Sequence, residues 1–199
     1  MEAFFSSLSI AFSLLFLTEL GDKTQLLVIS LALQEDSRVK LAIGATFGFL
    51  AIVTLGGVFA SIISQFLPIS WISLGSGIIF VILGGYQLER RLRLKNDTRE
   101  ADEGVIDFLP RNSLIAGFLG IFIMELGDKT QVMTILLATQ SPSFIGTLCG
   151  AWVALSLLAF IGAFTGSLIS KKLPKEKIEF LTAFLFIIVG VFAIIMWMR

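Results

Sequence analysis

The sequence predicts an all-α integral membrane protein with six transmembrane helices, arranged as two inverted three-helix repeats. The first observation is composition: only 15% of the 199 residues are charged, and the mean hydropathy is +0.92. Soluble domains carry about 25% charged residues. The second is a set of continuous apolar runs, which are typical of membrane helices and not of alternating membrane strands. The third is an internal duplication that spans almost the whole chain.

Six apolar segments are long enough to cross a bilayer. A helix needs roughly 20 residues to span about 30 Å of hydrocarbon. The first segment is longer than this, so we expect it to be tilted or broken. It also lacks the basic start of a signal peptide, so we predict that it is retained. The predicted spans are residues 6–33, 41–64, 71–88, 113–139, 144–170 and 178–198.

Basic residues fall almost entirely on one side of the predicted bundle. With six spans, the three loops near 34–40, 89–112 and 171–177 share a face, whereas the opposite face holds only Arg199. Cytoplasmic loops are enriched in lysine and arginine, so both termini are predicted to lie outside the cytoplasm. The loop residues are Arg38, Lys40, Arg90, Arg91, Arg93, Lys95, Arg99, Arg111, Lys171, Lys172, Lys175 and Lys177.

The second half of the chain repeats the first at a constant offset of 106 residues. Each half has three predicted spans, an odd number, so the second half enters the membrane from the opposite side. This inverted plan is common among secondary transporters, although pores and scaffolds are also duplicated. We predict a first repeat at 1–88, a charged cytoplasmic linker at 89–112 and a second repeat at 113–199.

The longest perfect repeat is the heptad Glu-Leu-Gly-Asp-Lys-Thr-Gln, at 19–25 and 125–131. Ionisable groups at the centre of a bilayer cost at least about 2.5–3.5 kcal/mol each, so the six in these heptads need partners. The alternative to a functional site is that each half neutralises itself, for example through a Glu19–Lys23 pair at i, i+4. We predict that the carboxylates bind metal: Glu19, Asp22, Glu125 and Asp128.

Helical spacing predicts the geometry of this site. Glutamate and aspartate at i, i+3 lie on one helix face, so an antiparallel crossing of the first and fourth spans would gather all four carboxylates near the midplane. The glycines indicate close packing or local unwinding. The lysines either hold a carboxylate when the ion leaves or form structural ion pairs. The supporting residues are Gly21, Lys23, Thr24, Gln25, Gly127, Lys129, Thr130 and Gln131.

The chemistry of these groups favours a hard divalent cation. Carboxylate, hydroxyl and amide oxygens suit Ca²⁺ and Mn²⁺, while Mg²⁺ sheds water reluctantly. Four carboxylates and two lysines leave a charge of −2, which one divalent cation or two protons would cancel. The resulting hypothesis is that the protein exchanges one divalent cation for protons. A cation channel and an exporter of amino acids or other small solutes remain alternatives.

Several other functions are excluded by composition. The chain has no histidine and a single cysteine, Cys149, so the usual zinc, copper and haem ligand sets are absent. A net charge of zero leaves no basic face for nucleic acid. No nucleophile and base pair is apparent, so an enzyme is not expected, and no cofactor is predicted beyond the transported ion.

The two heptads resemble the Glu-x-Gly-Asp-(Lys/Arg)-(Thr/Ser) motif of the Gdt-type cation exchangers, a family with Golgi, chloroplast and cyanobacterial members. Both copies fit the motif, and the resemblance extends over essentially the whole chain. It implies exchange of Mn²⁺ or Ca²⁺ for protons, with the four carboxylates as ion ligands and Thr24 and Thr130 as their neighbours. The family is also distantly similar to the lysine-exporter superfamily.

The short N-terminus is typical of a bacterial member, in the plasma or thylakoid membrane. The resemblance leaves open the preference between Mn²⁺ and Ca²⁺, the proton stoichiometry, coupling to Na⁺, and whether the protein is a monomer or a homodimer.

Overall fold

The computed structural model describes residues 1–34, 37–93, 109–169 and 175–198. This part of the chain contains helices and no strand. Residues 94–108 of the predicted linker and 171–174 of the predicted basic loop lie outside the described residues. The helices are α1 (Glu2–Glu19), α2 (Lys23–Gln34), α3 (Arg38–Phe66), α4 (Ile69–Arg93), α6 (Ser113–Glu125), α7 (Lys129–Gln140), α8 (Phe144–Ile169) and α9 (Lys175–Trp197).

Two of the predicted spans are interrupted. The segment 6–33 is divided into α1 and α2, which confirms the expected break, and 113–139 is divided in the same way into α6 and α7. Helix α4 continues to Arg93, so the first residues of the predicted linker at 89–112 are helical. The charged residues at its end are good helix formers and extend the helix beyond its apolar part.

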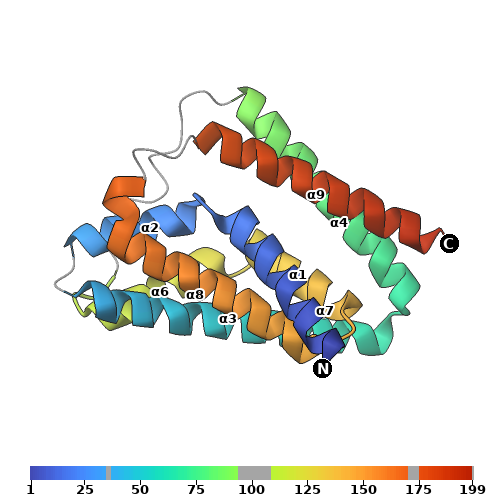
Figure 1. Cartoon of the computed structure of the whole chain (residues 1–199), viewed down its shortest axis with the longest axis horizontal. Helices are drawn as coiled ribbons and strands as arrows, with labels where there is room; N and C mark the ends of the chain where they lie inside the picture. Colours follow the sequence, from blue (N-terminus) through green and yellow to red (C-terminus); the bar gives the residue numbers. More distant parts are fainter. Residues whose placement is uncertain (35–36, 94–108, 170–174, 199) are drawn as a thin grey trace.

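The helices pack in pairs drawn from opposite halves of the chain. Helix α1 packs on α8, α3 packs on α6, and α4 packs on α9. Helices α4 and α9 lie side by side along one edge, next to the group formed by the other six described helices (Figure 1). Since α6 repeats α1 and α8 repeats α3, the first two pairs are the same contact made twice.

Glycines bring these helices into close contact at equivalent positions. A Cβ atom at Gly44 of α3 would overlap the carbonyl oxygen of Leu114 in α6, and one at Gly150 of α8 would overlap that of Leu8 in α1. Both glycines and both leucines are separated by the repeat offset of 106. The same small residue therefore makes the same backbone contact in both halves.

At the α4–α9 interface, one phenylalanine contacts its own repeat counterpart. Phe80 stacks on Phe186 with ring centroids 5.8 Å apart, and the two residues are 106 positions apart. Both side chains are almost fully buried. A residue that contacts its own repeat counterpart must lie near the approximate two-fold axis that relates the two halves. The Phe80–Phe186 stack therefore lies near this axis.

Apolar side chains cover the outside of the described helices. Phe47, Ile82 and Phe192 are each more than half exposed, and such a surface is expected against lipid and not against water. Among the described residues, Glu2–Glu19, Arg38–Phe66 and Phe144–Phe164 are long and apolar enough to cross a membrane. Shorter apolar helices occur at Ser70–Tyr86, Ser113–Glu125 and Ala183–Ile195.

Candidate functional site

Both heptads form the same turn between two helices. Leu20 (φ −63°, ψ 118°) is followed by Gly21 (φ 79°), and the Asp22 amide donates to the Glu19 carbonyl at 3.2 Å. These are the features of a type II β-turn, which requires a positive φ at its third residue and therefore favours glycine there. The turn Glu125–Asp128 repeats them, with φ 77° at Gly127.

This turn corrects the predicted placement of the carboxylates on one helix face. Glu19 is the last residue of α1, whereas Asp22 lies just before α2. The two carboxylates are therefore separated by a β-turn and do not lie on one face of a continuous helix. The Leu-Gly pair at the centre of each motif could have predicted this turn, because glycine adopts a positive φ at a much lower conformational free energy than other residues do. The expected unwinding at the glycines is confirmed.

The glutamine of each heptad completes the turn. The Gly21 amide donates to Gln25 Oε1 at 2.6 Å, and the Gly127 amide donates to Gln131 Oε1 at 2.8 Å. Backbone polar groups inside a membrane must find partners within the protein. The amide oxygens that we considered as ion ligands therefore already accept from the backbone in this conformation.

Replacing Gly127 by alanine tests the turn by itself. A Cβ at Gly127 would meet nothing within 4 Å, so the penalty is purely conformational, about 1–2 kcal/mol for a positive φ. We expect Gly127→Ala to lower the thermal unfolding temperature in detergent. Gly85→Ala is the matched control, because a Cβ at this helical glycine also meets nothing within 4 Å. Equal unfolding temperatures for the two variants would contradict the strained turn.

The break in the helix frees a carbonyl group that then binds a cation. In a continuous helix, the Thr18 carbonyl would accept from the Asp22 amide, but this amide bonds to Glu19 instead. The Thr18 oxygen accepts from the Lys129 ammonium at 3.0 Å. The unpaired carbonyls at a helix C-terminus carry partial negative charge, which favours a cation at this position.

Ion pairs link the two heptads across the halves of the chain. Lys129 Nζ lies 2.9 Å from Asp22 Oδ2 and 3.6 Å from Glu19 Oε1, and Lys23 Nζ lies 2.9 Å from Asp128 Oδ2. The Lys–Asp pairs are equivalent under the repeat. The described ion pairs of these residues thus run between the halves and not within one, unlike the self-neutralising alternative.

The two copies differ in their remaining contacts. The Lys129 side chain is 13% exposed and contacts three oxygens, whereas Lys23 is 43% exposed and forms its described ion pair with Asp128. Glu125 accepts a hydrogen bond from the Thr24 hydroxyl.

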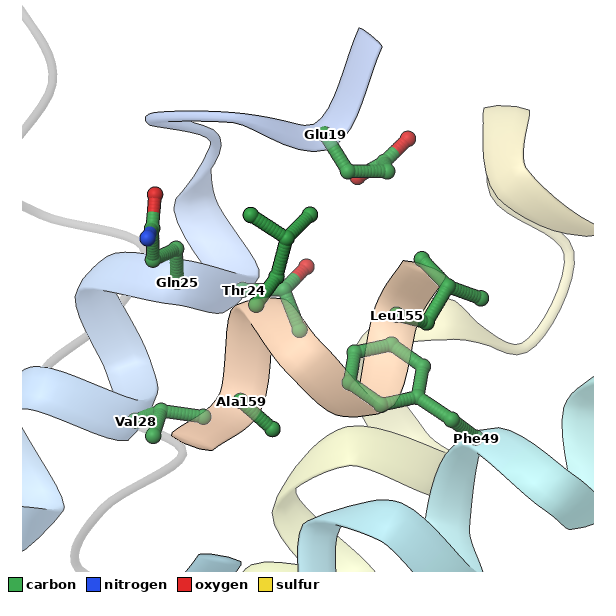
Figure 2. A pocket seen from close by; sticks show the side chains of 8 residues that line it. Glu19, Thr24, Gln25, Val28, Phe49, Leu155 and Ala159 are labelled. Atoms are coloured by element: carbon green, nitrogen blue, oxygen red, sulfur yellow. The ribbon is translucent and has the colours of Figure 1, made fainter. Parts of the chain in front are cut away.

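A small pocket lies beside the first copy of the heptad. Glu19 and Thr24 line it together with Phe49 of α3 and Leu155 of α8 (Figure 2), and it has room for roughly one water-sized guest. Phe49 and Leu155 are repeat counterparts. They were not predicted from the sequence, because apolar residues at such positions give no signal that separates a pocket from a core.

The four predicted metal ligands come together in one region. Glu19 and Glu125 are 4% and 0% exposed, while the side chains of Asp22 and Asp128 are about a quarter exposed. Lys129 of the second heptad contacts Glu19 and Asp22 of the first, and Thr24 of the first heptad donates a hydrogen bond to Glu125 of the second. Within the described ranges, no three acidic side chains are arranged to hold a metal. In this conformation, lysines and hydroxyls surround the carboxylates.

Comparison with known proteins identifies the family. The GDT1 family, described as a divalent cation/proton antiporter, matches residues 7–92 and again residues 113–198. The chain belongs to the GDT1 family. This is a family of transporters and not of enzymes, which agrees with the apolar helices and makes the chain a multi-pass membrane protein. The two matches have the same offset as the heptads.

Relatives within the GDT1 family come from several kinds of organism. A GDT1-like protein of Synechocystis is 26% identical over 197 residues, which cover 92% of this chain and 93% of the relative. A Vibrio cholerae protein named "Putative manganese exporter" is 27% identical, with 95% and 90% covered. PAM71 of Arabidopsis thaliana chloroplasts is 29% identical, with 92% and 55% covered. No solved structure matches the chain.

Proposed function

We propose that this protein exchanges a divalent cation, Mn²⁺ or Ca²⁺, for protons through a midplane site of four carboxylates: Glu19, Asp22, Glu125 and Asp128. The observation that carries the proposal is the meeting of the two heptads, in which each lysine pairs with the aspartate of the other copy. Membership of an antiporter family supports it. The name of the Vibrio relative favours Mn²⁺ as the substrate.

The charge of the site suits an exchange of one divalent cation for protons. Four carboxylates and two lysines sum to −2, which a single divalent cation or two protons would neutralise. A site that is neutral in both loaded states can change conformation within the low-dielectric membrane interior with a smaller desolvation free energy than a charged site. Carboxylate and carbonyl oxygens are the ligands that Ca²⁺ and Mn²⁺ accept.

Six spans in two inverted repeats would supply the alternating access that exchange requires. The equivalent glycine contacts and the Phe80–Phe186 stack support this arrangement. The N-terminus and the C-terminus lie toward the same end of the molecule, opposite the end of α2 (Figure 1). Six spans place both termini on one side of the membrane, and the basic loops favour the side outside the cytoplasm of a bacterial plasma membrane, or the corresponding side of a thylakoid membrane.

The proposal is tested in proteoliposomes that contain a trapped pH dye, with the membrane potential clamped. Mn²⁺, Ca²⁺, Mg²⁺ and Na⁺ are added in turn outside the vesicles. We expect Mn²⁺ or Ca²⁺ to drive proton movement in the opposite direction, because the site is proposed to hold one or the other. Vesicles without protein give the background leak.

The possible outcomes separate the classes of transporter. Cation entry without a proton counter-flow would replace the exchanger with a channel. A lack of response to every cation would overturn the proposal and favour a small solute such as an amino acid. A response to Na⁺ alone would change the proposed substrate.

A further inference from the structure

The Lys129 ammonium lies in an oxygen cage of the kind that binds a cation. Its three neighbours are the Thr18 carbonyl oxygen at 3.0 Å, Asp22 Oδ2 at 2.9 Å and Glu19 Oε1 at 3.6 Å. An ammonium group donates hydrogen bonds and accepts none, so oxygen atoms are its natural neighbours. The Thr18 carbonyl accepts a hydrogen bond from it, and the two carboxylates are its ion-pair partners. The same carboxylate and carbonyl oxygens are those that a hard divalent cation would take.

We propose that Lys129 is a tethered substitute for the transported cation, and that a metal ion enters the Thr18, Glu19 and Asp22 oxygens only when this ammonium leaves. The inference rests on the proposed function and identifies the Lys129 ammonium as the group that competes with the transported cation for its oxygens. It also adds a ligand, the Thr18 main-chain carbonyl, which no sequence motif indicates. The metal and Lys129 would then occupy the same oxygens in turn.

The comparison with Lys23 separates this role from that of a simple counter-ion. Each lysine follows the aspartate of its own heptad, and each pairs with the aspartate of the other heptad at 2.9 Å. Within the described residues, Lys129 also contacts a glutamate and a helix-terminal carbonyl, and its side chain is 13% exposed against 43% for Lys23. Long-range electrostatics would affect the two lysines alike, whereas direct competition would involve Lys129 alone in this state.

A tethered cation would also stabilise the buried Glu19 carboxylate and the partly buried Asp22 carboxylate. Burying an unpaired carboxylate is costly, and the cost falls when an opposite charge with hydrogen bonds accompanies it. Lys129 reaches across from α7 to supply this charge to the turn after α1. Because the lysine is covalently attached, its local concentration is high, and it can displace a bound ion at the end of transport.

The test measures Mn²⁺ binding to purified protein in detergent, from the electron paramagnetic resonance signal of free Mn²⁺, and transport of Mn²⁺ in proteoliposomes. Lys129→Gln removes the competitor, and Lys23→Gln is the matched control. We expect Lys129→Gln to bind Mn²⁺ about tenfold or more tightly, since a charged hydrogen bond no longer has to be broken. Its KM should fall together with its maximal rate, because release slows.

Equal changes in Lys129→Gln and Lys23→Gln would overturn the inference, as would weaker Mn²⁺ binding in Lys129→Gln. A structural role would lower the rate without lowering KM. Lys129→Arg keeps the charge and tests the idea even if the glutamine variant does not fold. This variant should bind Mn²⁺ no more tightly than the wild type, and tighter binding would count against the inference.

The binding assay also keeps this inference distinct from the proposed function. Mn²⁺ binding that is sensitive to Lys129, in a wild-type protein that moves no protons, would refute proton exchange and support the tethered cation. Proton exchange in a wild-type protein whose Mn²⁺ affinity does not respond to Lys129 would support the function and refute the tethered cation.

Discussion

Glu19→Gln is expected to abolish cation-driven proton movement while the protein remains folded. Glu19 is buried, lines the pocket and lies 3.6 Å from the Lys129 ammonium. The amide has nearly the same shape but carries no charge and takes up no proton. Loss of an outer-shell partner of a metal site costs about 10–100-fold in affinity or activity, so we expect at least about 100-fold for a direct ligand.

Asp128→Asn should produce a loss of the same kind from the second heptad. Asp128 pairs with Lys23, so the variant also leaves this lysine without its described ion pair. Glu2→Gln is the control, because it neutralises an exposed carboxylate outside the heptads. Initial rates of proton movement in proteoliposomes and unfolding temperatures are compared for all three. Wild-type rates in Glu19→Gln or Asp128→Asn would refute the four-carboxylate site.

Gly44→Ala is expected to destabilise the protein severely, because its Cβ would overlap the carbonyl oxygen of Leu114 on the facing helix. This neighbour is backbone and cannot move aside as a flexible side chain would. Overpacking typically costs 1–3 kcal/mol, and we expect a cost at or above about 3 kcal/mol here. The equivalent variant, Gly150→Ala, meets the backbone of Leu8 and should behave in the same way.

The control for both substitutions is Gly75→Ala. A Cβ at this position in α4 would meet nothing within 4 Å, so we expect unfolding close to that of the wild type. The measurement is the yield of monodisperse protein from detergent together with its unfolding temperature. If Gly44→Ala were as stable as Gly75→Ala, the close α3–α6 contact would be wrong.

The amino-acid sequence alone determined the class of protein, its helical segments and the residues of the candidate site. Hydropathy locates membrane segments because every backbone group in lipid must be paired within the segment. The duplicated heptad singled out the buried charges because such charges are too costly to keep without a role. The Leu-Gly pair in each heptad also favours the β-turn, because this preference depends on local sequence alone. The i, i+3 spacing of Glu19 and Asp22 nevertheless led to the prediction of a single helix face.

Only the tertiary structure decided which groups meet. The two heptads are identical, so no local signal can tell whether Lys129 pairs within its own half or with Asp22 of the other half. The same identity hides the difference between the buried Lys129 and the more exposed Lys23. That difference depends on how α1 and α7 pack in one conformation, and packing between distant segments is a property of the whole fold and not of either heptad.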